Sequence, residues 1–154
     1  MRRYYAYLLY VLRHKLEVFK AGFEIGVPLH QLVLHDWSKF TPSEFVAYAE
    51  SFYEADGTKR KGKPTEAFSY AWNRHQKIQP HHWQFWCITH DSGKLHALRM
   101  PDRFVQEMLA DWIGAGIVIN GRNEAREWYE KNKDKMWLHP DTRARVEQLL
   151  EVHG

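Results

Sequence analysis

Seven residues that can bind a metal ion follow one another along this chain, and one lysine lies among them. In chain order they are His14, the pair His35-Asp36, His75, the pair His81-His82 and Asp111, with Lys39 three residues after Asp36. Imidazole nitrogen and carboxylate oxygen are ligands that hold divalent transition metals in proteins. The sequence therefore predicts a metal site, provided that the fold brings these residues together.

Asp36 is the expected shared ligand of two ions. A carboxylate has two oxygens and can contact two cations, whereas a neutral imidazole offers one free nitrogen. Adjacent helical residues point about 100° apart, so His35 and Asp36 reach one ion only where a helix ends or bends. We expect a first ligand set of His14, His35, Asp36 and Asp111, and a second of Asp36, His75 and His81 or His82.

Each candidate ligand also has a purely structural interpretation. A histidine inside a helix, such as His14, is more often a core or surface residue than a ligand, and His81-His82 alone would simply begin a helix. Asp111 lies in an apolar stretch, where a buried carboxylate needs a cation or hydrogen-bond donors, and that cation could be Arg or Lys. Taken together and in this order, the residues favour metal binding.

Helical periodicity predicts the elements that position these residues. Apolar residues recur every three or four positions, and Pro, Gly and Thr mark the ends of the segments. Thr41, Pro42 and Glu44 fit an N-cap, a first helical position and a capping box. No segment shows a convincing strand pattern, and residues 89–100 are expected to form a loop. We predict an all-α fold of about seven or eight helices, over residues 2–24, 28–35, 41–52, 65–75, 80–86, 101–113, 124–131 and 141–152.

Length and composition favour one domain over residues 1–154. Charged residues make up 27% and apolar residues 44%, which is typical of a globular protein and excludes a disordered one. The seven Trp, eight Tyr and eight Phe predict an aromatic core. Trp37, Trp83 and Trp112, which each directly follow a proposed ligand, would either pack around the site or serve ordinary helix packing. A Trp-rich surface would also support a homodimer.

Charge and cysteine content restrict the binding partners and the cellular compartment that we expect. The net charge of +3 is small, and its densest run, Lys59 to Lys63, lies between Gly57 and Pro64, so we interpret it as a solvated loop rather than a nucleic-acid patch. The single cysteine, Cys87, cannot form an internal disulfide. The N-terminal apolar run is short and contains charged residues, which does not fit a signal peptide or a membrane span. We expect a cytoplasmic protein without membrane contact.

The ligand series resembles that of the HD-domain metalloproteins, a superfamily named for its His-Asp pair. Its helical fold takes ligands in the order His, His-Asp, Asp, and its two-metal members add histidines before the last Asp. The chain follows this order from His14 to Asp111. The resemblance implies a compact HD-domain-like bundle that holds one or two divalent ions of Mn, Fe, Co, Ni or Zn. Seven residues separate His75 from His82, so a second ion requires a short turn between them.

Further motifs refine this resemblance. Residues 35–39 are similar to the HDxGK stretch of HD-GYP phosphodiesterases, but the glycine and the GYP segment are absent, so cyclic-dinucleotide specificity does not carry over. A second doublet, His90-Asp91, matches HDxGK more literally and is interpreted as part of a loop. The segments HDxSKFxPxEF, AWxxH, HHW and MPxxxxxEMxxDW resemble a small family from bacteria and their phages, which implies no function.

The leading hypothesis is a metal-dependent phosphohydrolase for a small phosphorylated molecule, with a nucleotide as the first candidate. Lys39 would then contact a phosphate oxygen, and Glu44 would act as general base or orient a ligand. In the simpler interpretation Lys39 is a helix-end cation and Glu44 only a cap, which we prefer for Glu44. One alternative is a di-iron oxygenase, because a branch of the same superfamily places iron on this ligand order. The other is a non-catalytic helical binding module.

Overall fold

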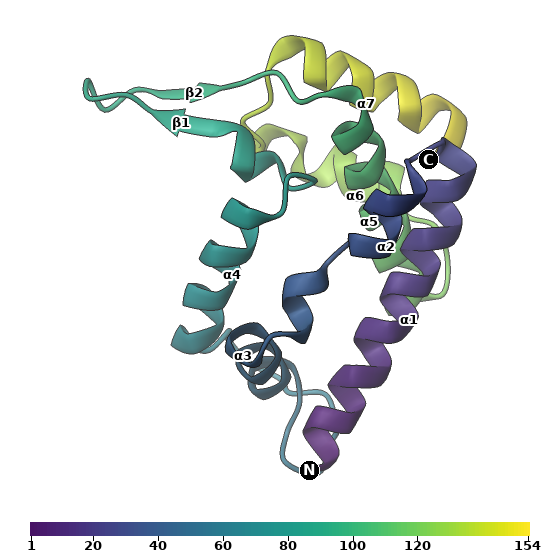
Figure 1. The fold of residues 1–154 in the computed structure, drawn as a ribbon, viewed down its shortest axis with the longest axis vertical. Helices are drawn as coiled ribbons and strands as arrows, with labels where there is room; N and C mark the ends of the chain where they lie inside the picture. The colour runs from purple at the N-terminus through teal and green to yellow at the C-terminus, as the bar shows by residue number, and fades with distance from the viewer.

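Seven α-helices make up most of the structure, a computed structural model that describes residues 1–154 (Figure 1). The all-α prediction is confirmed. Three short 3₁₀ turns and one small hairpin connect the helices. The elements are α1 (Arg2–Ile25), α2 (Leu29–Leu34), η1 (Trp37–Phe40), α3 (Pro42–Phe52), α4 (Glu66–Ile78), η2 (Trp83–Trp86), β1 (Cys87–Thr89), β2 (Leu95–Ala97), α5 (Asp102–Asn120), α6 (Ala125–Asn132), η3 (Lys133–Lys135) and α7 (Pro140–His153).

The two longest helices, α1 and α5, pack against each other through small residues. A side chain at Gly114 would come within 2.8 Å of the backbone nitrogen of Val18, so only glycine permits this approach. The sequence indicates Gly114, Gly116 and Gly121 as residues that close this helix, and the structure gives that role to Gly121 alone. The helix continues to Asn120, and Gly121 ends it in the left-handed conformation. Gly114 serves helix packing instead of helix termination.

Two apolar cores lie on either side of one buried histidine of α1. The larger core includes Val18 and residues of α5, α6 and α7, whereas the smaller joins Tyr7 and Val11 to α3 and α4. His14 lies between Val11 and Val18 on α1 and is 3% exposed. A polar layer therefore separates the two cores.

The region between α4 and α5 differs most from the prediction. The helix expected at residues 80–86 is a single 3₁₀ turn, η2, and α4 extends beyond His75 to Ile78. The loop expected at residues 89–100 includes part of a hairpin, in which Cys87 pairs with Ala97 and Thr89 with Leu95. Each strand is only three residues long and mostly exposed, so it shows no apolar alternation.

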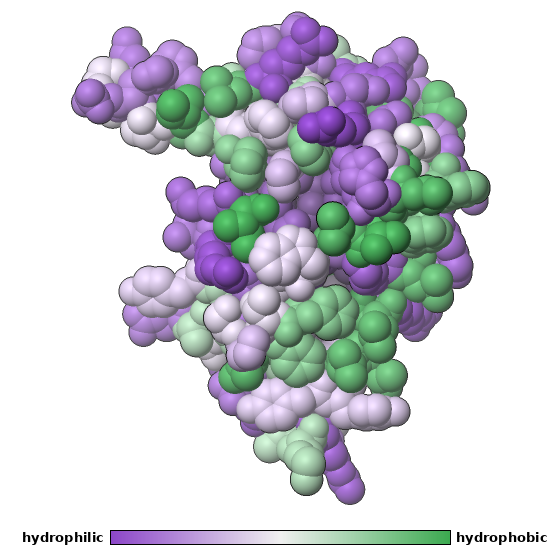
Figure 2. Space-filling model, in the orientation of Figure 1, coloured by the Kyte–Doolittle hydropathy of each residue, from purple (hydrophilic) through white to green (hydrophobic).

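Apolar side chains are also exposed on the face that carries α1 and α2 (Figure 2). Leu9, Leu12 and Leu16 of α1 are each about half exposed, and Val33 and Leu34 of α2 are more so. No helix is both long and apolar enough to cross a membrane. The homodimer that we expect from a Trp-rich surface stays a prediction.

Candidate metal centre

The structure brings all seven predicted ligands together in two groups that share Asp36. Within each group the candidate ligand atoms lie within 4.8 Å of one another. The first group contains two carboxylates and two imidazoles, the second one carboxylate and three imidazoles. We call them the first quartet (His14, His35, Asp36 and Asp111) and the second quartet (Asp36, His75, His81 and His82).

Asp36 directs one carboxylate oxygen to each quartet. Its Oδ1 lies 3.1 Å from Nε2 of His75 and 3.6 Å from Nε2 of His81. Its Oδ2 lies 3.4 Å from Nε2 of both His14 and His35. The side chain is completely buried. Each oxygen therefore faces its own group of imidazole nitrogens, which is the geometry that a bridging carboxylate would need.

An unusual backbone conformation allows His35 and Asp36 to face the same centre. Asp36 is the one non-glycine residue with positive φ (56°), between the end of α2 and the start of η1. Such a conformation is uncommon outside glycine, although Asp tolerates it better than most residues. Lys15 donates from Nζ to the carbonyl oxygens of Val33 and His35, which holds the end of α2 against α1.

Helices α1 and α5 supply the remaining ligands of the first quartet. His14 of α1 places Nε2 3.0 Å from Oδ1 of Asp111 on α5, and Nε2 of His35 lies 3.6 Å from the same oxygen. For the second quartet, the chain turns after α4, so that His75 near the end of α4 and His81 after the turn both reach Asp36. The short interval between them is spanned by this turn.

The imidazole nitrogens that face the carboxylates lack hydrogen-bond partners. In five histidines Nε2 is buried and makes no hydrogen bond, although four of these atoms lie within 3.6 Å of a carboxylate oxygen. Buried polar atoms without partners are rare in proteins and require an explanation. A cation site requires nitrogen and oxygen atoms with free lone pairs that converge on one point without hydrogen-bonding one another. The residues of both quartets therefore fit a metal ion. The five are His14, His35, His75, His81 and His82.

Two buried glutamates hold the other side of the imidazole rings. Glu107 of α5 accepts from Nδ1 of His35 at 2.9 Å, lies 3.3 Å from Nδ1 of His81, and also accepts from Gln31. Glu44 of α3 accepts from Nδ1 of His75 at 2.9 Å. A hydrogen bond donated by Nδ1 fixes the tautomer that leaves the Nε2 lone pair free for a metal.

The roles of the two glutamates differ from those expected from the sequence. Our preferred interpretation of Glu44 as a cap was wrong, because its carboxylate is buried and also accepts from Ser38 and Arg74, at 2.8 Å each. Glu107 was not recognised. It lies one helical turn before Asp111 on the same apolar helix, and this spacing was the available signal.

Electrostatics keep the carboxylates of the site ionised. Burial alone would raise the pKa of Asp36, but Lys39 and His35 outweigh it and hold this pKa well below its usual value. Burial likewise opposes the charge of His35, yet Asp36, Asp111 and Glu107 raise its pKa well above 6.5. Burial and the neighbouring His81 lower the pKa of His82. The second quartet therefore includes a neutral imidazole, the form that binds metals.

Lys39 contacts the centre through Asp36. Its Nζ lies 2.5 Å from Oδ2 of Asp36, and burial of the ammonium is outweighed by this carboxylate, which raises the pKa of Lys39. The lysine thus remains charged beside the shared ligand.

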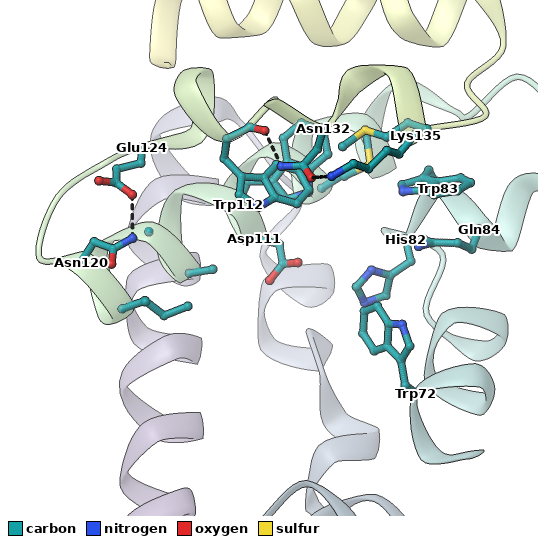
Figure 3. A pocket seen from close by; sticks show the side chains of 16 residues that line it. Trp72, His82, Trp83, Gln84, Asp111, Trp112, Asn120, Glu124, Asn132 and Lys135 are labelled. Carbon is teal, nitrogen blue, oxygen red and sulfur yellow. Dashed lines mark hydrogen bonds between the residues drawn. The ribbon is translucent and has the colours of Figure 1, made fainter. Parts of the chain in front are cut away.

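A pocket of about 370 Å³ opens onto both quartets. His82 of the second quartet and Asp111 of the first line it from facing sides (Figure 3). Trp83 and Trp112, which follow proposed ligands in the sequence, line it as well. Trp37 is about half exposed and lines a different pocket, beside Glu107. The expectation that all these tryptophans enclose the site therefore holds for Trp83 and Trp112.

Comparison with known proteins gives the family. A family model matches residues 3–152, which is nearly the whole chain. The chain belongs to DUF5662, a family of unknown function. Comparisons with curated proteins and with solved structures found no match. The geometry of the centre is therefore the main guide to what this DUF5662 protein does.

The remaining histidines of this DUF5662 protein lie outside the centre. The doublet His90-Asp91 is exposed at the turn of the hairpin, as its interpretation as a loop segment required. Four further histidines belong to neither quartet, which agrees with their position outside the series: His30, His96, His139 and His153.

Proposed function

We propose that this protein is a metal-dependent phosphohydrolase that acts on a small phosphorylated molecule. The observation that carries the proposal is the position of the Asp36 carboxylate. Each of its two oxygens faces a separate group of imidazole nitrogens that have no hydrogen-bond partner. Two-metal sites with shared ligands are common in enzymes that hydrolyse phosphate esters. The order of ligands, which resembles that of HD-domain hydrolases, supports the same reaction.

Each quartet would hold one divalent ion, with Asp36 between them. Ions bound there would supply Lewis acidity, because they lower the pKa of water and offset negative charge on a phosphoryl group. His82 and Asp111 line the pocket, so a phosphoryl group that enters it meets the edge of both quartets.

The other residues of the centre position groups and balance charge. Lys39 supplies a positive charge beside Asp36, where it would attract a phosphate oxygen. Glu44 and Glu107 orient the imidazole rings through Nδ1. Glu44 is completely buried and engaged by three donors, so we assign it this orienting role rather than that of a general base.

A phosphatase screen tests this function. Metal-free protein would be supplemented with Mn, Fe, Co, Ni or Zn and assayed on a panel of phosphate esters. We expect hydrolysis that requires metal and falls by at least about 100-fold in Asp36→Asn. The matched control is Asp91→Asn, in the exposed second doublet, which should retain full activity. Stoichiometric iron without hydrolysis of any ester would contradict the proposal and favour the oxygenase alternative.

A further inference from the structure

The pocket beside the quartets is built to hold a planar ring. Four of the seven tryptophans of the chain line it, from α4, η2, α5 and α6: Trp72, Trp83, Trp112 and Trp128. Its volume of about 370 Å³ is within the range of small-molecule sites. Indole side chains offer large, flat surfaces on which aromatic rings stack.

Contacts among the side chains hold these walls in place. The rings of Trp112 and Trp128 lie 4.9 Å apart between centroids, and Trp112 also stacks on Tyr129. Trp72 meets His82 of the second quartet edge to face at 5.1 Å. Figure 3 shows Trp72 beside His82, with Trp83 and Lys135 farther along the same pocket. The aromatic surface therefore begins directly at a candidate metal ligand.

Two residues that line the pocket have a polar atom without a partner in the protein, Nε2 of the candidate ligand His82 and Oε1 of Gln84. Oε1 of Gln84 is buried and accepts no hydrogen bond. Nearby polar groups are already occupied, since Asn132 donates to the carbonyl of Trp128 and accepts from Lys135. A buried acceptor without a donor is costly. Rotation of the Gln84 amide toward the pocket would let Oε1 accept a hydrogen bond from a ring that carries an N–H group, whereas a plain aryl ring offers no such donor.

The charge of the pocket limits how many phosphoryl groups of a substrate it can bind. Lys135 is its one cationic side chain, and Glu124 and Asp111 are acidic. Lys39 is already paired with Asp36. Polyphosphates are usually held by several Arg, Lys or metal cations. Beyond the quartets, the pocket therefore offers little to a second or third phosphoryl group.

We propose that the substrate is a nucleoside monophosphate whose base occupies the Trp-lined pocket and whose phosphoryl group reaches His82 and Asp111. This inference rests on the proposed hydrolase function for its reaction, but base binding itself requires no metal. Gln84 and the indole rings thus determine specificity, and the quartets do not.

Titration calorimetry of metal-free protein tests base binding separately from catalysis. The probes are adenosine, guanosine, cytidine and uridine, with ribose 5-phosphate as the ligand that lacks a base. We expect at least one nucleoside to bind with Kd below about 1 mM and ribose 5-phosphate not to bind. Absence of binding by all four nucleosides would overturn the inference.

Variants separate a specific pocket from nonspecific stacking. Gln84→Leu should weaken nucleoside binding by about fivefold to tenfold without loss of stability, since it removes an unsatisfied buried group. Trp128→Leu should weaken binding by at least about tenfold. Trp137→Leu, at a half-exposed tryptophan outside the pocket, is the control and should have no effect. Unchanged binding in both pocket variants would contradict the inference.

Hydrolysis distinguishes failure of this inference from failure of the proposed function. With metal, we expect nucleoside monophosphates to be hydrolysed at least about tenfold faster than the triphosphates and than ribose 5-phosphate. Equal rates on ribose 5-phosphate would overturn the inference and leave the hydrolase function intact. Nucleoside binding that depends on Gln84, together with no hydrolysis of any ester, would support the pocket and contradict the hydrolase.

Discussion

The two quartets share one ligand but are built in different ways. Long helices supply the first, through His14 of α1 and Asp111 of α5, which pack closely around Gly114. The end of α4 and the turn that follows it supply the second, through His75, His81 and His82. The first quartet thus depends on helix packing across the molecule, whereas the second depends mostly on one local turn.

The ligand types differ as well. Two carboxylates give the first quartet a more negative charge and more oxygen donors than the second, in which three of four ligands are imidazoles. Oxygen ligands suit Mn and Mg, and imidazole suits Zn, Ni, Cu and Fe. If each quartet holds one ion, as we propose, the shared carboxylate of Asp36 would join two sites of different metal preference.

The largest effect is expected at the shared ligand. Asp36→Asn weakens one ligand of both quartets and leaves Lys39 without its ion pair, so bound metal should fall from about two ions per chain to below about 0.2. Elemental analysis of the purified variant measures this, with Asp91→Asn as control. Retention of full occupancy would show that Asp36 does not bridge two ions.

Removal of an unshared ligand should separate the quartets. His14→Ala and His82→Ala should each leave about one ion per chain, because the other quartet keeps its four ligands. The ion retained in His82→Ala, in the quartet with two carboxylates, should exchange more readily with Mn than the ion retained in His14→Ala. Loss of both ions in either variant would mean that the quartets form one cooperative site.

The supporting glutamates should have smaller effects than the ligands. Glu44→Gln should lower metal affinity mainly in the second quartet by about 10- to 100-fold, since it weakens the support of His75. Glu107→Gln should affect both quartets, because Glu107 lies beside Nδ1 of His35 and of His81. Competition with a chromogenic chelator measures both affinities. Equal losses at both ions in Glu44→Gln would contradict this division.

The stability of the metal-free protein in acid should also depend on Glu107. Burial would raise the pKa of Glu107, but the hydrogen bond from His35 and the close approach of His81 outweigh it and lower the pKa from 4.5 to about 2. A depressed carboxyl pKa stabilises the fold above pH 4.5, and this contribution, on the order of 3 kcal/mol, is lost as the pH falls toward 2. Urea unfolding of metal-free protein should show a difference between wild type and Glu107→Gln that shrinks over this range. A difference independent of pH would contradict the assignment.

Periodicity and composition were sufficient to predict most of the helices. The bounds of α1, α3 and α7 agree with the prediction within about two residues, because each has a clear apolar pattern and a Gly or Pro near one end. The sequence alone could not decide which of Gly114, Gly116 and Gly121 ends α5, since glycine is suited both to helix ends and to close packing. Only the approach of Val18 shows which of the two applies at Gly114.

The candidate ligands could be proposed from their order, but the residues that orient them could not. Glu107 reaches His35 only because α2 and α5 come together, and no local pattern contains that contact. The left-handed conformation of Asp36 could not be predicted from residue types either. The sequence indicated only that a helix ends near this residue. The order of residues in the sequence thus identifies the candidate metal ligands. Tertiary packing decides which atom of each side chain faces the centre.

The metal content of the wild-type protein tests the central claim most directly. Purified protein loaded with Mn, Fe, Co, Ni or Zn and then desalted should carry about two ions per chain, and its Tm should fall when a chelator removes them. Less than about one tenth of an ion per chain, with a Tm that none of these metals changes, would contradict the two quartets as metal sites and leave a helical binding module as the better account.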